Sequence, residues 1–191
     1  MKIAILAWGS LILDPRDLPI EGRWQLNGPK LPIEFSRISD DKRLTLVIDA
    51  EHGEMVSTRY IQSSRSDLGD AICDLRCREK TIRKRIGFID LRHEISSAKE
   101  FPDHEAASAA IYAWLKPSSF HAVIWTALRS NFPKKRNEAF SPEAAVRYLD
   151  SLSESEQINA FKYINEAPVE VSTALRRLLT ELGKLRPEEK Q

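Results

Sequence analysis

Glu79 occupies the position in the sequence that points most directly to chemistry. A helix is expected over residues 67–80, and at about 100° per residue Glu79 shares a face with three apolar residues, Leu68, Ile72 and Leu75. This face must turn toward the core, so the apolar stripe ends on a carboxylate. A carboxylate taken out of water is costly unless it is paired or protonated, and such a group suits general acid/base catalysis near neutral pH.

The same position also has a structural interpretation. Three arginines lie close enough in the sequence to pair with the Glu79 carboxylate: Arg76, Arg78 and Arg83. A helix end can also turn away from the core, which would leave the carboxylate in water. Periodicity alone leaves the catalytic and structural interpretations open.

A second candidate is the loop after the first apolar segment. Residues 3–8 are apolar and end at Gly9, which predicts a buried strand followed by a loop. In the run Trp8-Gly9-Ser10-Leu11, successive backbone N–H groups can bind a carboxylate or an oxyanion, and the glycine permits close approach. An ordinary tight turn is the alternative. The Gly-Lys-Ser/Thr sequence of a phosphate loop does not follow.

Two further side chains are candidates for substrate contact. Arg37 lies at the end of a predicted strand, and its guanidinium can hold a carboxylate through two hydrogen bonds. Tyr60, in a later predicted strand, is a similar candidate.

The segment from Arg76 to Arg85 is strongly basic. It contains six basic residues and one acidic residue. A solvated helix end is the simpler interpretation, and an adaptor surface for nucleic acid or protein is the alternative. Lys134-Lys135-Arg136, expected in a loop, has the same two interpretations.

Metal and cofactor chemistry is not expected. Cys73 and Cys77 lie one turn apart in the predicted helix, and the four histidines occur singly, so no zinc ligand set is formed. The cysteines are expected as reduced thiols. The sequence also has no Gly-x-Ser-x-Gly motif of a serine hydrolase.

Composition indicates a globular protein. The chain has 191 residues, 42% hydrophobic and 30% charged, which is enough for a buried core without disulfides or metal. A net charge of +1 predicts no overall attraction to nucleic acid. No apolar run approaches the roughly 20 residues of a membrane span. The N-terminus lacks the features of a signal peptide, so a cytoplasmic location is expected. The oligomeric state is left open.

Alternation and turn residues predict an α+β protein. Strands are expected over residues 3–8, 31–36, 44–49, 56–60, 86–91 and 122–128, and helices over 67–80, 104–115, 141–152, 153–166 and 171–185. The turn residues at 39–42 predict a hairpin, and a second hairpin signal lies at 50–54. Ser66 is the expected N-cap of the first helix, and Ser141 before Pro142 predicts a capped start of the third. We expect one domain over residues 1–185, with a β-rich core over 1–130 and a helical part over 141–185. Residues 186–191 are expected to be a polar tail.

Two segments together resemble the γ-glutamylcyclotransferase-like family. Ala7-Trp8-Gly9-Ser10-Leu11-Ile12, followed by Asp14-Pro15, is similar to the Tyr-Gly-Ser loop that opens these proteins, most closely those of the glutathione-degrading branch. The helix end Leu75-Arg76-Cys77-Arg78-Glu79 resembles the one that carries the family's catalytic glutamate. The resemblance covers roughly residues 1–91. It differs at Trp8, where tyrosine is usual, and at Lys80, where glycine is usual.

The resemblance implies a fold and a reaction. The family fold is a small, mixed, largely antiparallel β-barrel with flanking helices. The reaction is cyclisation of a γ-glutamyl amide to 5-oxoproline without a cofactor, with Glu79 as general acid/base and the 8–11 loop binding the substrate. A pocket that binds a small molecule without turnover, in a regulatory protein, is the alternative.

Overall fold

The apolar N-terminal segment forms the middle of a six-stranded sheet. In the computed structural model, which describes residues 1–185, β1 (Ile3–Ala7) pairs antiparallel with β6 (Arg59–Ser63) and parallel with β9 (Ala122–Thr126). All five residues of β1 are buried. The short continuous apolar runs of β1 and β9 therefore reflect two covered faces, as in central strands generally.

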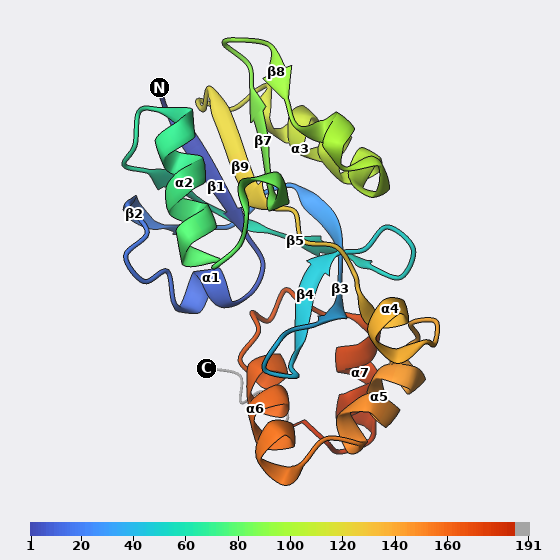
Figure 1. Cartoon of the computed structure of the whole chain (residues 1–191). Helices are drawn as coiled ribbons and strands as arrows, with labels where there is room; N and C mark the ends of the chain where they lie inside the picture. The colour runs from blue at the N-terminus through green and yellow to red at the C-terminus, as the bar shows by residue number, and fades with distance from the viewer. Residues whose placement is uncertain (186–191) are drawn as a thin grey trace. The chain divides into compact units, whose positions relative to one another are not determined.

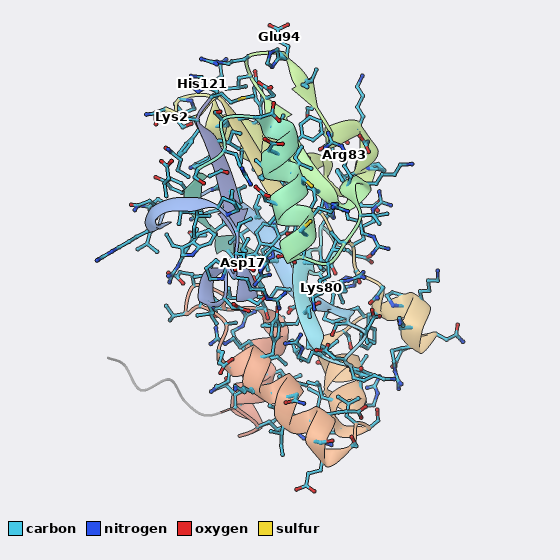
Figure 2. All side chains as sticks on the ribbon, turned by 60° about the vertical axis from the view of Figure 1, so that its left-hand side comes forward. Lys2, Asp17, Lys80, Arg83, Glu94 and His121 are labelled. Atoms are coloured by element: carbon cyan, nitrogen blue, oxygen red, sulfur yellow. The ribbon has the colours of Figure 1, made fainter. Side chains whose placement is uncertain are left out.

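The outer strands complete this sheet in the order β2-β6-β1-β9-β7-β8. β2 (Ile20–Gln25) pairs with β6, while β7 (Ile86–Asp90) lies between β9 and the two-residue β8 (Ile95–Ser96). Every pairing except β1–β9 is antiparallel. The start of β1 is held beside the start of β9 by two hydrogen bonds. Lys2 N–H donates to His121 Nδ1, and His121 N–H donates to the Lys2 carbonyl, both at 2.9 Å (Figure 2).

Helix α2 (Leu68–Arg78) covers one face of this sheet. Its predicted apolar stripe is confirmed, because Leu68, Ile72 and Leu75 pack in one core cluster with Ile5 of β1 and Ile124 of β9. Figure 1 shows α2 lying along β1 and β9, with α3 (Glu105–Leu115) beyond β7 and β8. The N-cap is Asp67, whose carboxylate accepts from Asp70 N–H, so the helix begins one residue later than the expected start with Ser66 as N-cap.

A separate three-stranded sheet carries the order β4-β3-β5. Its strands are β3 (Lys30–Ile38), β4 (Leu44–Ile48) and β5 (Glu54–Ser57). The predicted β3–β4 hairpin with its turn at Ser39-Asp40-Asp41-Lys42 is confirmed, with Lys42 N–H donating to the Ser39 carbonyl. Lys42 adopts a positive φ of 67°, which completes the tight turn.

Four helices follow β9 in the described chain, up to residue 185. They are α4 (Phe132–Arg136), α5 (Pro142–Asp150), α6 (Glu154–Asn165) and α7 (Ala174–Glu181). The predicted start of α5 is confirmed, because the Ser141 side chain caps Ala144 N–H and Pro142 is the first helical residue. Packing joins α5 to α7, and α6 to β4 (Figure 1). The helical C-terminal part is therefore present as expected, while the polar tail predicted over residues 186–191 lies outside the described residues.

Contacts divide the chain into two compact units. Unit 1 consists of residues 1–31 and 57–128 and contains the six-stranded sheet, α1 (Ser10–Leu13), α2 and α3. Unit 2 consists of residues 32–56 and the chain from 129 on, and it contains β4 and helices α4–α7. The predicted strand over 56–60 is two strands, because β5 belongs to the small sheet and β6 to the large one.

The expected barrel is not found. Within residues 1–185 the strands form the two sheets above, and the larger one has β2 and β8 as its end strands, with no closure between them. The protein is thus a mixed α+β fold with a largely antiparallel sheet and flanking helices. The sequence patterns also missed β2 and α4, because the exposed residues of β2 show little apolar alternation and α4 is only five residues long.

Glu34 is a fully buried carboxylate in unit 2. Its Oε1 accepts from Phe35 N–H at 2.7 Å, and its Oε2 accepts from Leu175 N–H in the first turn of α7 at 3.3 Å. Burial raises the pKa of Glu34 above its ordinary value, although these hydrogen bonds and one from Thr173 oppose the shift. The carboxylate therefore accepts a hydrogen bond from the first turn of α7, and its burial costs desolvation free energy.

Glu34→Gln is expected to change how stability depends on pH. With a raised pKa, the folded protein keeps a proton that the unfolded chain has lost, so the stability contributed by protonated Glu34 is lost as pH rises from the ordinary glutamate value through the raised one. Urea unfolding over this interval should show the wild type losing stability relative to Glu34→Gln as pH increases. The difference in free energy of unfolding between the two proteins removes the contributions of the other titrating groups. If this difference does not vary with pH, the raised pKa of Glu34 is contradicted.

Candidate active site

Glu79 follows the last residue of α2 and caps the helix. Its N–H donates to the Leu75 carbonyl at 3.0 Å, which continues the helical geometry by one residue. Its side chain is 16% exposed, and Oε1 accepts a hydrogen bond from Arg78 Nη1 at 2.6 Å. The carboxylate therefore lies at the boundary between core and solvent and is paired with one of the three arginines that the sequence allowed.

Arg78 links this helix end to the segment after α1. Its side chain is 6% exposed, and its Nε and Nη2 donate to the Asp14 carbonyl at 3.1 and 2.5 Å. In the opposite direction, Arg16 Nη1 donates to the Arg78 carbonyl at 3.2 Å. These bonds hold the end of α2, where Glu79 lies, beside Asp14 and Arg16 in unit 1. Sequence reasoning named Arg78 only as a possible partner, because the Asp14 carbonyl that fixes it is distant in the chain.

The predicted loop after β1 is a single helical turn. Gly9 is its N-cap, and Ile12 N–H donates to the Gly9 carbonyl at 2.9 Å. Helix geometry leaves the N–H groups of Ser10 and Leu11 without a carbonyl partner inside the turn. The side chains of Trp8 and Leu11 are buried, and Leu11 belongs to the core cluster with α2. This segment therefore offers backbone N–H groups and the half-buried Ser10 as its polar groups.

Arg37 belongs to unit 2, and Tyr60 belongs to unit 1. Arg37 is on β3, and its Nη1 donates to the Arg129 carbonyl at 2.9 Å, which ties two segments of unit 2. Tyr60 is on β6 opposite Leu6, and its ring packs edge-on against Trp114 and Phe120 with centroids 5.0 and 5.8 Å apart. The described contacts of both residues are structural, and their predicted contact with a substrate stays a prediction.

The basic segment 76–85 is divided among different roles. Arg78 faces inward, whereas Arg76 Nη2 lies 3.2 Å from Cys77 Sγ and 3.7 Å from Cys73 Sγ, both exposed free thiols. Lys80 turns the chain after α2 with a φ of 49°, and Arg83 begins the short 3-10 helix η1 (Arg83–Arg85) (Figure 2). The segment is therefore not a uniform solvated helix end, because α2 ends at Arg78 and one of its arginines is structural.

Two aspartate–histidine pairs close the loops that follow β4 and β7. The loop after β7 is a hairpin turn to β8, whereas the loop after β4 leads to β5 on the other side of β3, so the hairpin expected there is not formed. Asp90 accepts from Arg92 N–H and from His93 Nδ1 at 2.9 and 2.7 Å, and Asp49 accepts from His52 N–H and lies 3.3 Å from His52 Nδ1. For both aspartates burial favours a higher pKa, but the hydrogen bonds outweigh it and lower the pKa below its usual value. The same five-residue pattern, Ile-Asp-x-x-His, occurs at 48–52 and 89–93. Each aspartate therefore stabilises its own loop by accepting hydrogen bonds from the backbone and the histidine within it.

Neither a metal centre nor a membrane span is found in the part of the chain that the structure describes. No three His, Cys, Asp or Glu side chains of residues 1–185 come together to hold a metal ion. No helix in the same range is long and apolar enough to cross a bilayer.

Two segments of unit 1 offer groups for chemistry, the Glu79 carboxylate and the first N–H groups of α1. A carboxylate at the solvent boundary can accept and return a proton, and the first N–H groups of α1 can donate to an oxygen. Comparison of the chain with protein-family models, with curated proteins and with solved structures finds no match.

Proposed function

We propose that this protein is a γ-glutamylcyclotransferase-like lyase that cyclises a γ-glutamyl amide to 5-oxoproline, with Glu79 as general acid/base. The observation that carries the proposal is the position of Glu79. A carboxylate ends the buried stripe of α2 and is tied through Arg78 to the segment that follows Gly9-Ser10-Leu11. The two segments that carry the family resemblance are thus neighbours in unit 1.

The reaction needs few protein groups. The α-amine of the substrate attacks its own γ-carbonyl carbon, a C–N bond forms in the ring, and the amide C–N bond to the leaving amine breaks. Both reacting groups belong to one molecule, so the protein has to hold the substrate folded rather than join two reactants. No covalent intermediate with the enzyme is required.

Glu79 performs the proton transfer in this proposal. Its carboxylate takes a proton from the attacking α-ammonium and returns one to the nitrogen of the leaving amine. The N–H groups of Ser10 and Leu11 bind the substrate carboxylate or the oxygen of the tetrahedral intermediate. Arg78 is a positioning residue, because its guanidinium bonds both Glu79 Oε1 and the Asp14 carbonyl.

The test is direct detection of product. The protein is incubated with glutathione, γ-glutamyl dipeptides and γ-glutamyl amines, and 5-oxoproline is measured by mass spectrometry together with the freed amine. Equal amounts of both products are expected from at least one substrate class. Trp8 and Lys80 depart from the family pattern, so the panel extends beyond glutathione.

Absence of product would reject the enzyme proposal. If the folded protein forms no 5-oxoproline from any member of the panel, yet one of them raises its melting temperature, the site is a binding module without turnover. If no member has either effect, the γ-glutamyl ligand class itself is wrong.

A further inference from the structure

Unit 2 contains a pocket of about 180 Å³ with a basic lining. The lining residues are Ile38, Ser39, Asp40, Lys42, Lys135, Arg136 and Tyr148. Three of them are cations and one is a carboxylate, so the lining has a formal charge of +2. Ligand pockets for drug-sized molecules are larger, about 300–1,000 Å³, so this one suits a small charged group.

The pocket is built from elements that are fixed to each other. Asn131, just before α4, bonds both backbone groups of Ile38 at the end of β3, with Ile38 N–H donating to Oδ1 at 2.7 Å and Nδ2 donating to the Ile38 carbonyl at 2.9 Å. This pair of bonds holds α4 beside the β3–β4 turn (Figure 1). One helical turn later, Lys135 and Arg136 therefore face the turn that carries Lys42.

Tyr148 of α5 fixes the other side of the pocket. Its hydroxyl donates to the Lys42 carbonyl at 2.7 Å, and the guanidinium of Arg136 lies 5.2 Å from the centre of its ring. Burial raises the pKa of Tyr148, so the phenol remains a neutral donor over the ordinary pH range. A cation over an aromatic face is held by the ring quadrupole, which positions the Arg136 guanidinium before any ligand arrives.

Asp40 also lines the pocket, and its single negative charge offsets only one of the three cations. Within residues 1–185, no carboxylate forms an ion pair with Lys42, Lys135 or Arg136. The nearby Asp41 pairs instead with Arg43 at 2.7 Å. Glu156 is within electrostatic reach of Lys42, but its Oε2 is held by the Ser153 hydroxyl and N–H at 2.8 and 3.0 Å. The lining charge is therefore available to a ligand.

We propose that this pocket binds the phosphate group of a small phosphorylated molecule. Arg136 offers a planar fork of donors that matches two phosphate oxygens, and the ammonium groups of Lys42 and Lys135 add charge without fixed geometry. Ile38 and the ring of Tyr148 form an apolar wall for the organic part of a phosphomonoester. All residues that line the pocket belong to unit 2, and this inference does not depend on the cyclotransferase proposal.

Lys134 provides a matched control. It is the neighbour of Lys135 on α4, carries the same charge and is exposed, but it does not line the pocket. Binding of inorganic phosphate and phenyl phosphate is measured by isothermal titration calorimetry for the wild type and for Lys134→Gln, Lys135→Gln and Arg136→Gln. All three positions are on the surface, and thermal unfolding verifies that each variant is folded.

The wild type is expected to bind one phosphate group saturably, with phenyl phosphate tighter than inorganic phosphate. Arg136→Gln should weaken binding by about tenfold or more, because a charge-assisted bidentate contact is lost, and Lys135→Gln should weaken it less. Lys134→Gln should remain within about twofold of the wild type, since a charge outside the pocket is screened by salt.

Three results would overturn the proposal. The first is absence of saturable phosphate binding. The second is an equal loss of phosphate affinity in Lys134→Gln and Arg136→Gln, which would mean diffuse attraction of anions to a basic surface. The third is a single-stranded oligonucleotide that binds more tightly than phenyl phosphate and loses affinity in Lys134→Gln. That result would assign the surface to nucleic acid.

Discussion

Glu79→Gln is expected to lower kcat/KM for the formation of 5-oxoproline by roughly 10²–10⁴-fold, which is the usual contribution of a positioned general acid/base. The amide has the shape of the carboxylate and can still contact Arg78 through its oxygen, but it cannot accept a proton from the α-ammonium. Initial rates with the best substrate of the panel measure the effect. The loss should appear mainly in kcat, because proton transfer occurs in the transition state.

Measuring the stability of Glu79→Gln and of Arg78→Lys distinguishes a catalytic role of Glu79 from a purely structural one. If the pairing of Glu79 with Arg78 were only structural, Glu79→Gln would reduce activity in proportion to the folded fraction, and Arg78→Lys would do so too. If Glu79 moves the proton, the Gln variant should be folded at the assay temperature and inactive. Arg78→Lys should keep part of the activity, because the carboxylate is still present. A folded Glu79→Gln protein with wild-type rates would remove Glu79 from the mechanism.

Gly87→Ala is expected to destabilise unit 1 by about 3 kcal/mol, at the upper end of the usual cost of overpacking a core. Gly87 on β7 pairs with Trp125 on β9, and a Cβ at residue 87 would lie 2.2 Å from Trp125 Cε2 and 2.5 Å from Cζ2. The indole is 0% exposed, so it cannot move into solvent to make room. Either the ring or the strand must shift. Urea unfolding followed by circular dichroism measures the loss.

A double-mutant cycle tests the cause of this loss. In a Trp125→Leu background the side chain opposite residue 87 is smaller, so Gly87→Ala should cost at least about 1 kcal/mol less than in the wild type. An equal cost in both backgrounds would mean that the indole is not what excludes a side chain at residue 87. The conformational freedom of glycine in the unfolded chain would then be the better explanation.

The elements that could be predicted from the sequence are those with strong local patterns. The stripe of α2 repeats at helical spacing, and the Ser141-Pro142 start of α5 combines a capping side chain with a residue suited to the first turn. β1 and β9 are continuous apolar runs in central strands. In each case the signal lies within one segment, so no knowledge of the rest of the chain is needed.

The missed elements depend on partners that are distant in the sequence. β2 has mostly exposed residues and exists as a strand because it pairs with β6. The segment at 54–63 appears continuous, yet β5 and β6 belong to different sheets, since strand pairing and not alternation decides where a strand ends. Barrel closure likewise depends on whether the end strands β2 and β8 pair with each other. The sequence of a single segment does not show this pairing.

In the candidate site, too, some features follow from local sequence patterns and others from contacts between distant segments. Periodicity placed Glu79 on the apolar face of α2, but Arg76, Arg78 and Arg83 were equal partners on the basis of spacing. The Asp14 carbonyl, 64 residues from Arg78 in the chain, is what selects Arg78. Similarly, Leu11 was a candidate for substrate binding because it belongs to the loop that follows Gly9. Its side chain packs into the core, so only its backbone N–H can contact a substrate.

By itself, the sequence determined the α+β class, the helices with clear caps, and the presence of a carboxylate at the end of a buried stripe. These are properties of side-chain spacing within single segments. Only the tertiary structure decided which arginine pairs with Glu79, which segments Arg37 and Tyr60 contact, and that Lys135 and Arg136 line a pocket with Lys42. Each of these depends on hydrogen bonds and packing between segments that the chain brings together only when it folds.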